Sequence, residues 1–252
     1  MKTQKNKKDS IEEVHERLSG SMTLRDLAGS GANYLQGTGK VNVSGLVTDS
    51  RRVTPGSAFF ALPGLRTNGN EHLKEALDRG AKVVVSEKEG LDLPLGVTGL
   101  QVDDSRLALA KFAKRYHGSP DRSLRVVGIT GTNGKTTVSS LVRHLIERPG
   151  RPVGLIGTVR YHLGDREVPS FKTTPESSDL FALLRSMLAA GCSETVMEVS
   201  SHGIHQARVA GLEMEVATFL NLTRDHLDYH GNMEDYFREK RKIFNGDNGS
   251  LP

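Results

Sequence analysis

The chain has 252 residues, of which 36% are hydrophobic and 25% are charged, and this composition excludes a disordered or fibrous protein. At roughly 150 residues per domain, the length predicts two folding units. The net charge is +4, but four lysines precede the first acidic residue, Asp9, and the remainder is balanced with 30 basic (34 minus 4) and 30 acidic residues, so no basic surface for nucleic acid is expected.

The first segment, residues 1–20, is rich in lysine and charged throughout, and we expect it to be a disordered tail. It does not lead into an apolar stretch, so a signal peptide is not expected. No stretch of the chain approaches 18 uncharged apolar residues, and no membrane span is expected. The single cysteine, Cys192, cannot form an internal disulfide, which predicts a cytoplasmic protein, and it is interpreted as a small buried residue.

Residues 21–120 have a mixed pattern that predicts a small α/β domain. Short β-branched and aromatic runs predict strands at 43–48, 57–62, 81–86 and 99–102. Apolar spacing predicts a helix after Asn70 and a second helix that Asp104 or Ser105 can cap. The Gly-Ser-Pro-Asp cluster at residues 118–121 is the best candidate for a linker.

Residues 121–252 alternate more regularly, which predicts a parallel sheet covered by helices. Strands are expected at 124–130, 153–159, 195–199 and 216–220, with helices after the first strand and at 177–190 and 233–244. The fold class is therefore α/β: a small mixed N-terminal domain followed by a parallel-sheet domain of the P-loop ATPase type. Only about four strands precede the last residues, so this second domain is expected to be incomplete.

A glycine loop joins the first of these strands to a helix, with the sequence Gly131-Thr132-Asn133-Gly134-Lys135-Thr136-Thr137. Such a loop can wrap backbone N–H groups around a phosphate at a helix N-terminus, while Lys135 reaches the outer phosphates and Thr136 ligates magnesium. The strict nucleotide-binding pattern would place its first glycine at residue 129. Here residue 129 is isoleucine and the glycine stands one position earlier, at Gly128, so the spacing departs by one residue. An ordinary strand-to-helix turn is the alternative interpretation, and the flanking strand and helix favour the nucleotide.

Further ligands should come from the ends of neighbouring strands. Glu198 ends the strand 195–199, and His226 follows the strand 216–220, so both are candidates to hold a cation beside Thr136. Zinc held by His226 and His230 is a weaker alternative, since no cysteine cluster accompanies them. A hydrolase built on Ser201 and His202 is also disfavoured, because adjacent residues rarely act as nucleophile and base.

Taken together, four stretches resemble the Mur ligases, and most of all the member that adds the third amino acid to the peptide of peptidoglycan. They are Val47–Arg51 with Pro55–Gly64, Gly131–Thr137, Thr173–Pro175 with Glu198–His202, and Asn221–Gly231. The resemblance runs from about Leu24 to Phe244. It implies an ATP-dependent ligase that forms an acyl phosphate on a muramoyl dipeptide, which an incoming amine then attacks.

The resemblance also implies roles for individual residues. The nucleotide substrate, UDP-N-acetylmuramoyl dipeptide, would contact Ser50, Leu65, Arg66, Thr67, Thr173, Thr174, Ser200, Gln206 and Arg208. ATP would bind residues 131–137, with one Mg²⁺ at Thr136 and Glu198 and a second at His226, and Lys135, Glu198, His226 and Lys240 would act in catalysis. Lys240 aligns with a lysine that the family carries as a carbamate, although Arg238, Arg241 and Lys242 surround it with other cations.

Some expectations stay open at this stage. Lys172 stands before Thr173 where the resemblance predicts an uncharged polar residue, which puts that substrate contact in doubt. The family has a further C-terminal domain for the incoming diamino acid, meso-diaminopimelate or L-lysine, and its absence here predicts little activity for this chain alone. A binding module without catalysis, another Mur-type ligase and a small-molecule P-loop kinase are the alternatives, and we expect a monomer.

Overall fold

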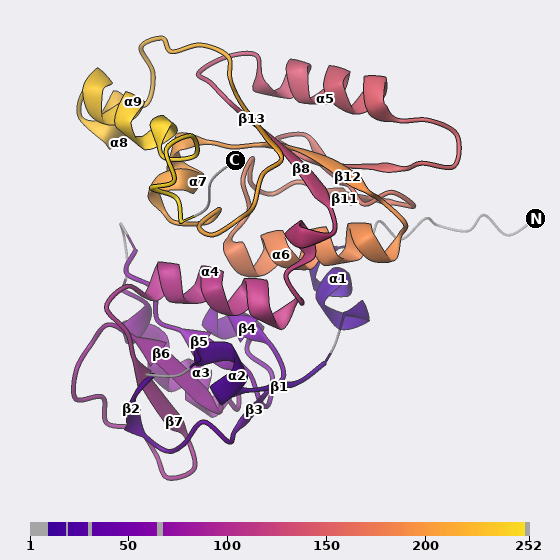
Figure 1. Cartoon of the computed structure of the whole chain (residues 1–252). Helices are drawn as coiled ribbons and strands as arrows, with labels where there is room; N and C mark the ends of the chain where they lie inside the picture. Colours follow the sequence, from indigo (N-terminus) through magenta and orange to yellow (C-terminus); the bar gives the residue numbers. More distant parts are fainter. Residues whose placement is uncertain (1–9, 19, 30–31, 65–67, 250–252) are drawn as a thin grey trace, which may run out of the picture. The chain divides into compact units, whose positions relative to one another are not determined.

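The computed structural model describes residues 10–18, 20–29, 32–64 and 68–249. Contacts divide the chain into two compact units (Figure 1). The described residues 20–118 form the N-terminal unit, and residues 10–18 and 119–249 form the central unit. The division between Gly118 and Ser119 falls within the segment that the sequence marks as a linker.

The N-terminal unit contains a five-stranded sheet with the order β2-β7-β6-β5-β4 and a two-stranded sheet of β1 and β3. Its strands are β1 (Met22–Thr23), β2 (Asn33–Gln36), β3 (Asn42–Val43), β4 (Leu46–Val47), β5 (Ala58–Phe60), β6 (Val83–Ser86) and β7 (Thr98–Gln101), and its helices are α2 (Leu24–Ala28), α3 (Leu73–Asp78), α4 (Ser105–Tyr116) and the short 3₁₀ turns η1 (Ser50–Arg52) and η2 (Gly69–His72). Strands β4 to β7 run parallel, and β2 is antiparallel to β7. The expected strand 43–48 is two short strands.

Local chemistry explains the best-defined helix of this unit. The Asp104 carboxylate accepts hydrogen bonds from the backbone N–H groups of Arg106 (2.9 Å) and Leu107 (2.8 Å), as an N-cap should. From there α4 packs on the sheet, where Phe112 meets Phe60 edge to face with ring centroids 5.4 Å apart. The predicted cap and helix are therefore both present.

The central unit is built on a six-stranded sheet with the order β11-β10-β9-β12-β8-β13. Its strands are β8 (Arg125–Thr130), β9 (Val153–Ile156), β10 (Arg160–His162), β11 (Glu167–Pro169), β12 (Glu194–Glu198) and β13 (Val216–Phe219), and its helices are α1 (Ile11–Arg17), α5 (Lys135–Ile146), α6 (Ser177–Ala189), α7 (Ser201–His205), α8 (Leu227–His230), α9 (Met233–Arg241) and the 3₁₀ turn η3 (Pro120–Arg122). Strands β9, β12, β8 and β13 are parallel, which confirms the predicted α/β class.

Two features of this sheet differ from the prediction. The strand expected over 153–159 ends at Ile156, and residues 160–169 form an antiparallel hairpin, β10 and β11, beside β9. The buried side chains Tyr161 and Val168 face the core while their neighbours Arg160 and Glu167 form an ion pair outside. This alternation is typical of a half-buried hairpin, so the sheet is mixed rather than wholly parallel.

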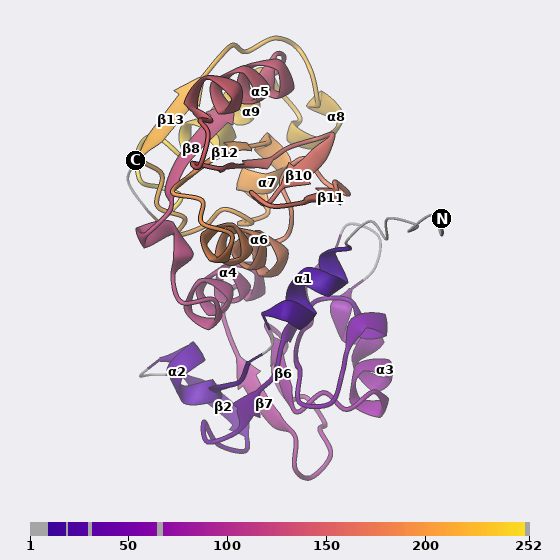
Figure 2. The ribbon, with the colours of Figure 1, turned by 90° about the vertical axis from the view of Figure 1, so that its right-hand side faces the viewer.

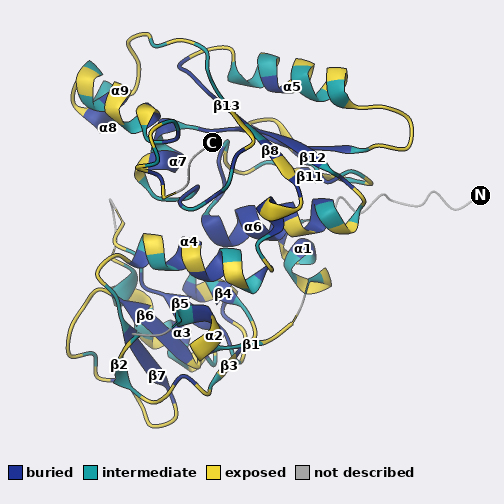
Figure 3. Cartoon of the chain, in the orientation of Figure 1, coloured by how far each residue is buried: buried dark blue, intermediate teal, exposed yellow. Residues whose placement is uncertain are grey.

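Helices α5 and α6 lie on opposite faces of the central sheet (Figure 2). On the α5 face, Ile129, Val153, Leu155 and Val196 form a buried apolar cluster that contacts Val138, Val142 and Ile146. Helix α6 is buried along most of its length, whereas the outer face of α5 is exposed (Figure 3). Burial on both faces explains why these strands have continuous apolar sequences.

Helix α1 corrects the expectation that residues 1–20 form a disordered tail, of which residues 1–9 lie outside the described part. The Ser10 hydroxyl caps α1 by accepting from the Glu13 N–H at 3.3 Å, and Ile11 and Val14 are buried. His15 Nε2 lies 2.8 Å from the Asp179 carboxylate of α6. Because acidic and basic residues separate the buried positions of α1, the short amphipathic helix is not evident from the sequence.

In the part of the chain that the structure describes, no helix combines the length and the apolar character that a membrane crossing requires.

Candidate functional site

The glycine loop leaves β8 at Thr130 and enters α5 at Lys135. Gly134 adopts the left-handed conformation with φ of 86°, which favours glycine, and a Cβ on Gly131 would lie 3.0 Å from the Cβ of Leu220. Asn221 braces the loop by accepting from the N–H groups of Thr132 (3.1 Å, backbone oxygen) and Asn133 (3.0 Å, side chain). Asn221 thereby fixes the loop at the N-terminus of α5, a kind of position where anions bind.

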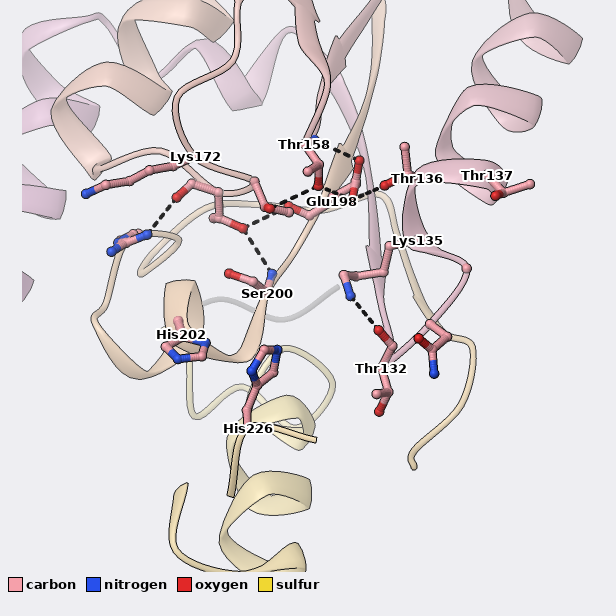
Figure 4. Close-up of a pocket in the computed structure, with 15 residues that line it drawn as sticks. Thr132, Lys135, Thr136, Thr137, Thr158, Lys172, Glu198, Ser200, His202 and His226 are labelled. Carbon is pink, nitrogen blue, oxygen red and sulfur yellow. Dashed lines mark hydrogen bonds between the residues drawn. The ribbon is translucent and has the colours of Figure 1, made fainter. Parts of the chain in front are cut away.

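A cavity of about 500 Å³ opens over this loop (Figure 4). It is lined by residues 132–137 of the loop and by Thr158, Lys172, Thr173, Thr174, Glu198, Ser200, His202, Arg208 and His226. The loop residues, Thr158 and Glu198 lie at or just beyond the carboxyl ends of β8, β9 and β12, where ligands of parallel sheets bind. The cavity therefore combines the predicted phosphate loop with four of the nine predicted substrate residues, Thr173, Thr174, Ser200 and Arg208.

Glu198 is the buried carboxylate at the centre of the site, with 1% of its surface exposed. Its Oε2 accepts from the Thr136 hydroxyl at 2.9 Å and from the Thr158 hydroxyl at 3.0 Å, and its Oε1 accepts from the Thr158 N–H at 2.9 Å. β8 and β12 are neighbours in register, with Glu198 beside Ile129, so the end of one strand meets the loop after the other. The predicted proximity of Thr136 and Glu198 is found.

Lys135 folds back over the loop and donates to the backbone oxygens of Gly131 and Thr132, both at 2.9 Å. Burial lowers the pKa of its ammonium group, and the negative charges of Glu198 and Asp225 oppose that effect. Because its present partners are neutral carbonyls, a bound phosphate would offer the ammonium a stronger acceptor. The position suits a group that binds anions.

Lys240 lies beneath the loop and is 1% exposed; it is not among the residues that line the cavity. Its Nζ donates to Gly131 O at 2.9 Å and lies 4.7 Å from the ring centre of Tyr236. Burial, followed by the nearby positive charge of Lys135, lowers the pKa of the Lys240 amine to about 7. The two amines share one carbonyl oxygen, which links α9 to the phosphate loop.

Thr173 and Thr174 follow the β10–β11 hairpin and enter the site from the side of β9. The Thr174 hydroxyl donates to Glu198 O and accepts from the Ser200 N–H, both at 3.0 Å. The Thr173 and Thr158 hydroxyls are 3.0 Å apart. The expected substrate residues Thr173, Thr174 and Ser200 thus form one hydrogen-bonded group around Glu198.

Arg208 is held by a carboxylate that it shares with a second cation. Its Nε lies 3.0 Å from Glu176 Oε1, and Lys172 Nζ lies 2.7 Å from the same oxygen. Gln206 does not line the cavity, but its side-chain oxygen accepts from Arg208 and its amide donates to Tyr229 OH at 3.1 Å. Lys172, which the sequence marked as a departure, therefore adds a positive charge at the wall of the cavity.

The histidines form a cluster on the far side of the cavity. His226 is half-exposed in a left-handed conformation at the start of α8, and its ring lies 4.9 Å from that of His202. His230 is buried, lies 2.9 Å from the Ser201 hydroxyl, and has a pKa lowered to about 4, first of all by burial. Ser201 thus pairs with His230, not with His202, and both are buried away from the cavity lining.

Among the described residues there is no group of three or more His, Cys, Asp or Glu side chains arranged to hold a metal ion, which gives the zinc alternative no support. Magnesium requires a different set of ligands from zinc, because it binds one or two carboxylates together with substrate phosphates and waters. Glu198 and Thr136 supply two oxygen ligands 2.9 Å apart beside the phosphate loop. These residues fit magnesium bound with a nucleotide.

Some predicted residues are not brought to this cavity. Ser50 belongs to the N-terminal unit, where it is buried and donates to Glu75 Oε2 at 2.6 Å. Leu65, Arg66 and Thr67 lie outside the described residues. Sequence reasoning also missed Thr158, although Gly157-Thr158 follows a buried strand just as the residues after Glu198 do.

Comparisons with known proteins agree with this geometry. Residues 129–250 match the family model described as the Mur ligase middle domain, and residues 42–117 match the one described as Mur ligase family, catalytic domain. A Geobacter metallireducens protein named UDP-N-acetylmuramoyl-L-alanyl-D-glutamate–2,6-diaminopimelate ligase is 46% identical over 224 residues. That match covers 88% of this chain and 44% of the relative, so the chain spans less than half of the relative's length.

Two solved structures are also similar. One, of a UDP-N-acetylmuramoyl-L-alanyl-D-glutamate–2,6-diaminopimelate ligase, superimposes with a TM-score of 0.75 at 29% identity, covering 91% of this chain and 46% of that one. The other, the MurF ligase of Thermotoga maritima in complex with ADP, gives a TM-score of 0.52 at 25% identity, covering 79% of this chain and 42% of that one.

Proposed function

Because the chain belongs to the Mur ligase family, we propose that it forms the nucleotide-binding and phosphoryl-transfer part of an ATP-dependent ligase. The reaction would join diaminopimelate to UDP-N-acetylmuramoyl-L-Ala-D-Glu, as the names of the relatives indicate. The observation that carries the proposal is the hydrogen bond between Thr136 of the phosphate loop and the buried Glu198 carboxylate. The cytoplasmic location and the monomeric state stay predictions.

The proposed chemistry begins with the terminal carboxylate of the dipeptide, which is a poor electrophile. Its oxygen attacks the γ-phosphorus of ATP, the bond from that phosphorus to ADP breaks, and an acyl phosphate forms. The amine of the incoming amino acid then attacks the acyl carbon, phosphate leaves, and the amine loses a proton. Magnesium bound at Thr136 and Glu198, with a second ion at His226, would offset the charge of the phosphates.

We assign ATP binding and dipeptide binding to residues on different sides of the cavity. The backbone N–H groups of the loop and the start of α5 would hold the ATP phosphates, and Lys135 would exchange its carbonyl partners for the outer phosphates. Thr173, Ser200 and Arg208, on the other side of Glu198, would hold the dipeptide. The arrangement brings a carboxylate substrate and a triphosphate to one cavity, which supports transfer between them.

Lys240 supports the proposal in a different way. Addition of CO₂ to a lysine requires the neutral amine, and a pKa of about 7 makes that form abundant at neutral pH. The product would be a carbamate with the loss of one proton, so the charge at Nζ would change from positive to negative. The repulsion between Lys135 and Lys240 would then become attraction. We propose Lys240 as the carbamylated residue of this chain.

Hydroxylamine trapping tests the phosphoryl transfer without the incoming amino acid. The chain is incubated with UDP-N-acetylmuramoyl-L-Ala-D-Glu, Mg-ATP, bicarbonate and hydroxylamine, and the products are examined by mass spectrometry. An acyl phosphate is captured as a hydroxamate of the dipeptide, and ADP is released in equal amount. The Glu198→Gln variant serves as the matched control, since it keeps the side-chain shape and removes the charge.

A hydroxamate made by the unchanged chain and lost in the Glu198 variant would support the proposal. A stable phosphorylated product that forms without a hydroxamate would instead identify a small-molecule kinase. If the chain binds the nucleotide substrate and produces neither compound, phosphoryl transfer by this part of the ligase is contradicted. Repeating the reaction with an equal mixture of diaminopimelate and lysine then tests which amine is joined.

A further inference from the structure

Thr158 has the most hydrogen bonds to Glu198, yet no motif identified in the sequence includes it. It stands two residues beyond the end of β9, at the wall of the cavity (Figure 4). Its backbone N–H donates to Glu198 Oε1 at 2.9 Å, and its hydroxyl donates to Glu198 Oε2 at 3.0 Å. One residue thus contacts both oxygens of the carboxylate.

Donors that reach both oxygens of a carboxylate fix its plane as well as its position. The Thr136 hydroxyl also donates to Oε2, but a cation bound there would take that oxygen and the Thr136 oxygen as ligands. Glu198 Oε1 has a further constraint, because a Cβ on Gly157 would lie 2.4 Å from it. The Gly157-Thr158 pair therefore gives the carboxylate both its space and its orientation.

The direction of the hydrogen bonds around Thr158 follows from counting protons. An ionised carboxylate can only accept, so the single Thr158 hydroxyl proton points to Glu198. The Thr173 hydroxyl, 3.0 Å from Thr158 Oγ1, must then be the donor of that pair. A one-way chain of hydrogen bonds runs from Thr173 through Thr158 to Glu198, and it keeps the Thr158 hydroxyl from turning away.

We propose that Thr158 is a positioning residue that pre-orients Glu198 for the magnesium ion of Mg-ATP. The inference rests on the proposed function, because it requires that Mg-ATP binds at this loop. Thr158 itself would not touch the metal or the nucleotide, and it would act through the carboxylate. Its loss should therefore weaken the contribution of magnesium to ATP binding and leave binding of metal-free ATP unchanged.

Three variants separate this role from general packing. Thr158→Val keeps the size, the β-branch and the N–H donor but removes the hydroxyl, and Thr158→Ser restores the hydroxyl. Thr195→Val makes the same chemical change on β12, three residues before Glu198, where the buried hydroxyl has no hydrogen-bond partner among the described residues. It is thus a control for removing a threonine hydroxyl from the same sheet.

The measurement is the affinity for ATP by calorimetry, once with magnesium and once with EDTA, for the whole chain and each variant. We expect magnesium to strengthen ATP binding in the unchanged chain, in Thr158→Ser and in Thr195→Val. In Thr158→Val the gain from magnesium should fall about tenfold, the size of effect that loss of a hydrogen bond to a charged group produces. Thermal unfolding without ligand checks that each variant folds.

An equal gain from magnesium in Thr158→Val and in the unchanged chain would overturn the inference. So would a loss of affinity that is the same in magnesium and in EDTA, because that result indicates a damaged loop rather than a misplaced carboxylate. Failure of the unchanged chain to bind ATP under either condition would overturn the proposed function, and the inference with it. The two failures are therefore distinguishable.

Discussion

Replacement of Lys240 by methionine should stabilise the fold while removing a residue that the proposed function needs. Methionine keeps the length of the aliphatic side chain and places no charge beneath the phosphate loop. In the present structure Lys240 is 1% exposed, and its amine lies near the ammonium group of Lys135, with which it shares the oxygen of Gly131. A buried cation in that place costs free energy whenever it is protonated.

The size of the effect follows from the pKa of Lys240, which is about 7 in the fold against an ordinary value of 10.5. At 1.36 kcal/mol for each pH unit, the difference corresponds to about 5 kcal/mol against folding when the amine is charged. The methionine variant loses hydrogen bonds to Gly131 O and Thr130 Oγ1, worth about 1 kcal/mol each. At pH 6 we therefore expect a net stabilisation of about 3 kcal/mol.

The lowered pKa of Lys240 also fixes the direction in which folding stability changes with pH. Between pH 7 and 10.5 the unfolded chain binds the Lys240 proton and the folded chain does not, so the unchanged chain gains stability as the pH rises through this window. The advantage of the methionine variant should shrink over the same range. It should be largest below pH 7, where the amine is protonated in both states.

Urea unfolding in buffers free of CO₂, at several values between pH 6 and 10, measures this difference. Lys242→Met is the control, because that side chain is 31% exposed and pairs with Glu239 at the surface, so a change below about 1 kcal/mol is expected. A methionine variant at position 240 that is less stable at pH 6, or whose advantage does not depend on pH, would refute the reasoning. Bicarbonate should stabilise only proteins that retain Lys240.

Four further predictions concern other parts of the fold. Gly157→Ala should fold normally by circular dichroism but lose magnesium-dependent ATP binding in calorimetry, since its Cβ would meet the Glu198 carboxylate. Thr195→Val should be neutral or stabilising by up to about 1 kcal/mol in urea unfolding, because it removes a buried hydroxyl without a partner among the described residues. Asp104→Ala should destabilise the N-terminal unit by about 1 kcal/mol in thermal unfolding through loss of the α4 cap. Asp104→Asn should retain most of the stability, because asparagine also caps helices. His230 has a pKa near 4 in the fold against 6.5 unfolded, so stability should fall by up to about 3 kcal/mol as the pH drops from 6.5 to 4, and His230→Gln should flatten that slope in urea titrations.

The strands around the phosphate loop could be predicted because both faces of the sheet are covered. Burial on both faces requires continuous apolar sequences, and such runs at β8 and β12 are visible without a structure. In a parallel sheet their carboxyl ends meet at one edge, which brings Glu198 to Thr136. Here the topology itself connects residues that are 62 positions apart.

Other elements are set by contacts that the sequence does not display. Helix α1 depends on a partner 164 positions away, since His15 meets Asp179, and its charged residues suggested a tail. The β10–β11 hairpin alternates buried Tyr161 and Val168 with charged neighbours around the turn at Gly164, but each strand is only three residues long, too short to stand out among the parallel strands. Short elements of this kind gain their stability from packing rather than from propensity.

The residues that hold Glu198 show why a motif describes only part of a site. A carboxylate buried at a strand end needs donors, and the chain supplies them from two separate segments, through Thr136 and Thr158, while the Thr174 hydroxyl donates to the backbone oxygen of the same residue. Only the first of these belongs to the glycine loop. Because Thr136 lies at the start of α5 and Thr158 lies just beyond β9, a nucleotide and a carboxylate substrate would meet at the same glutamate. The chemistry that we propose for the cavity therefore requires Thr158 as well as the loop that identifies it.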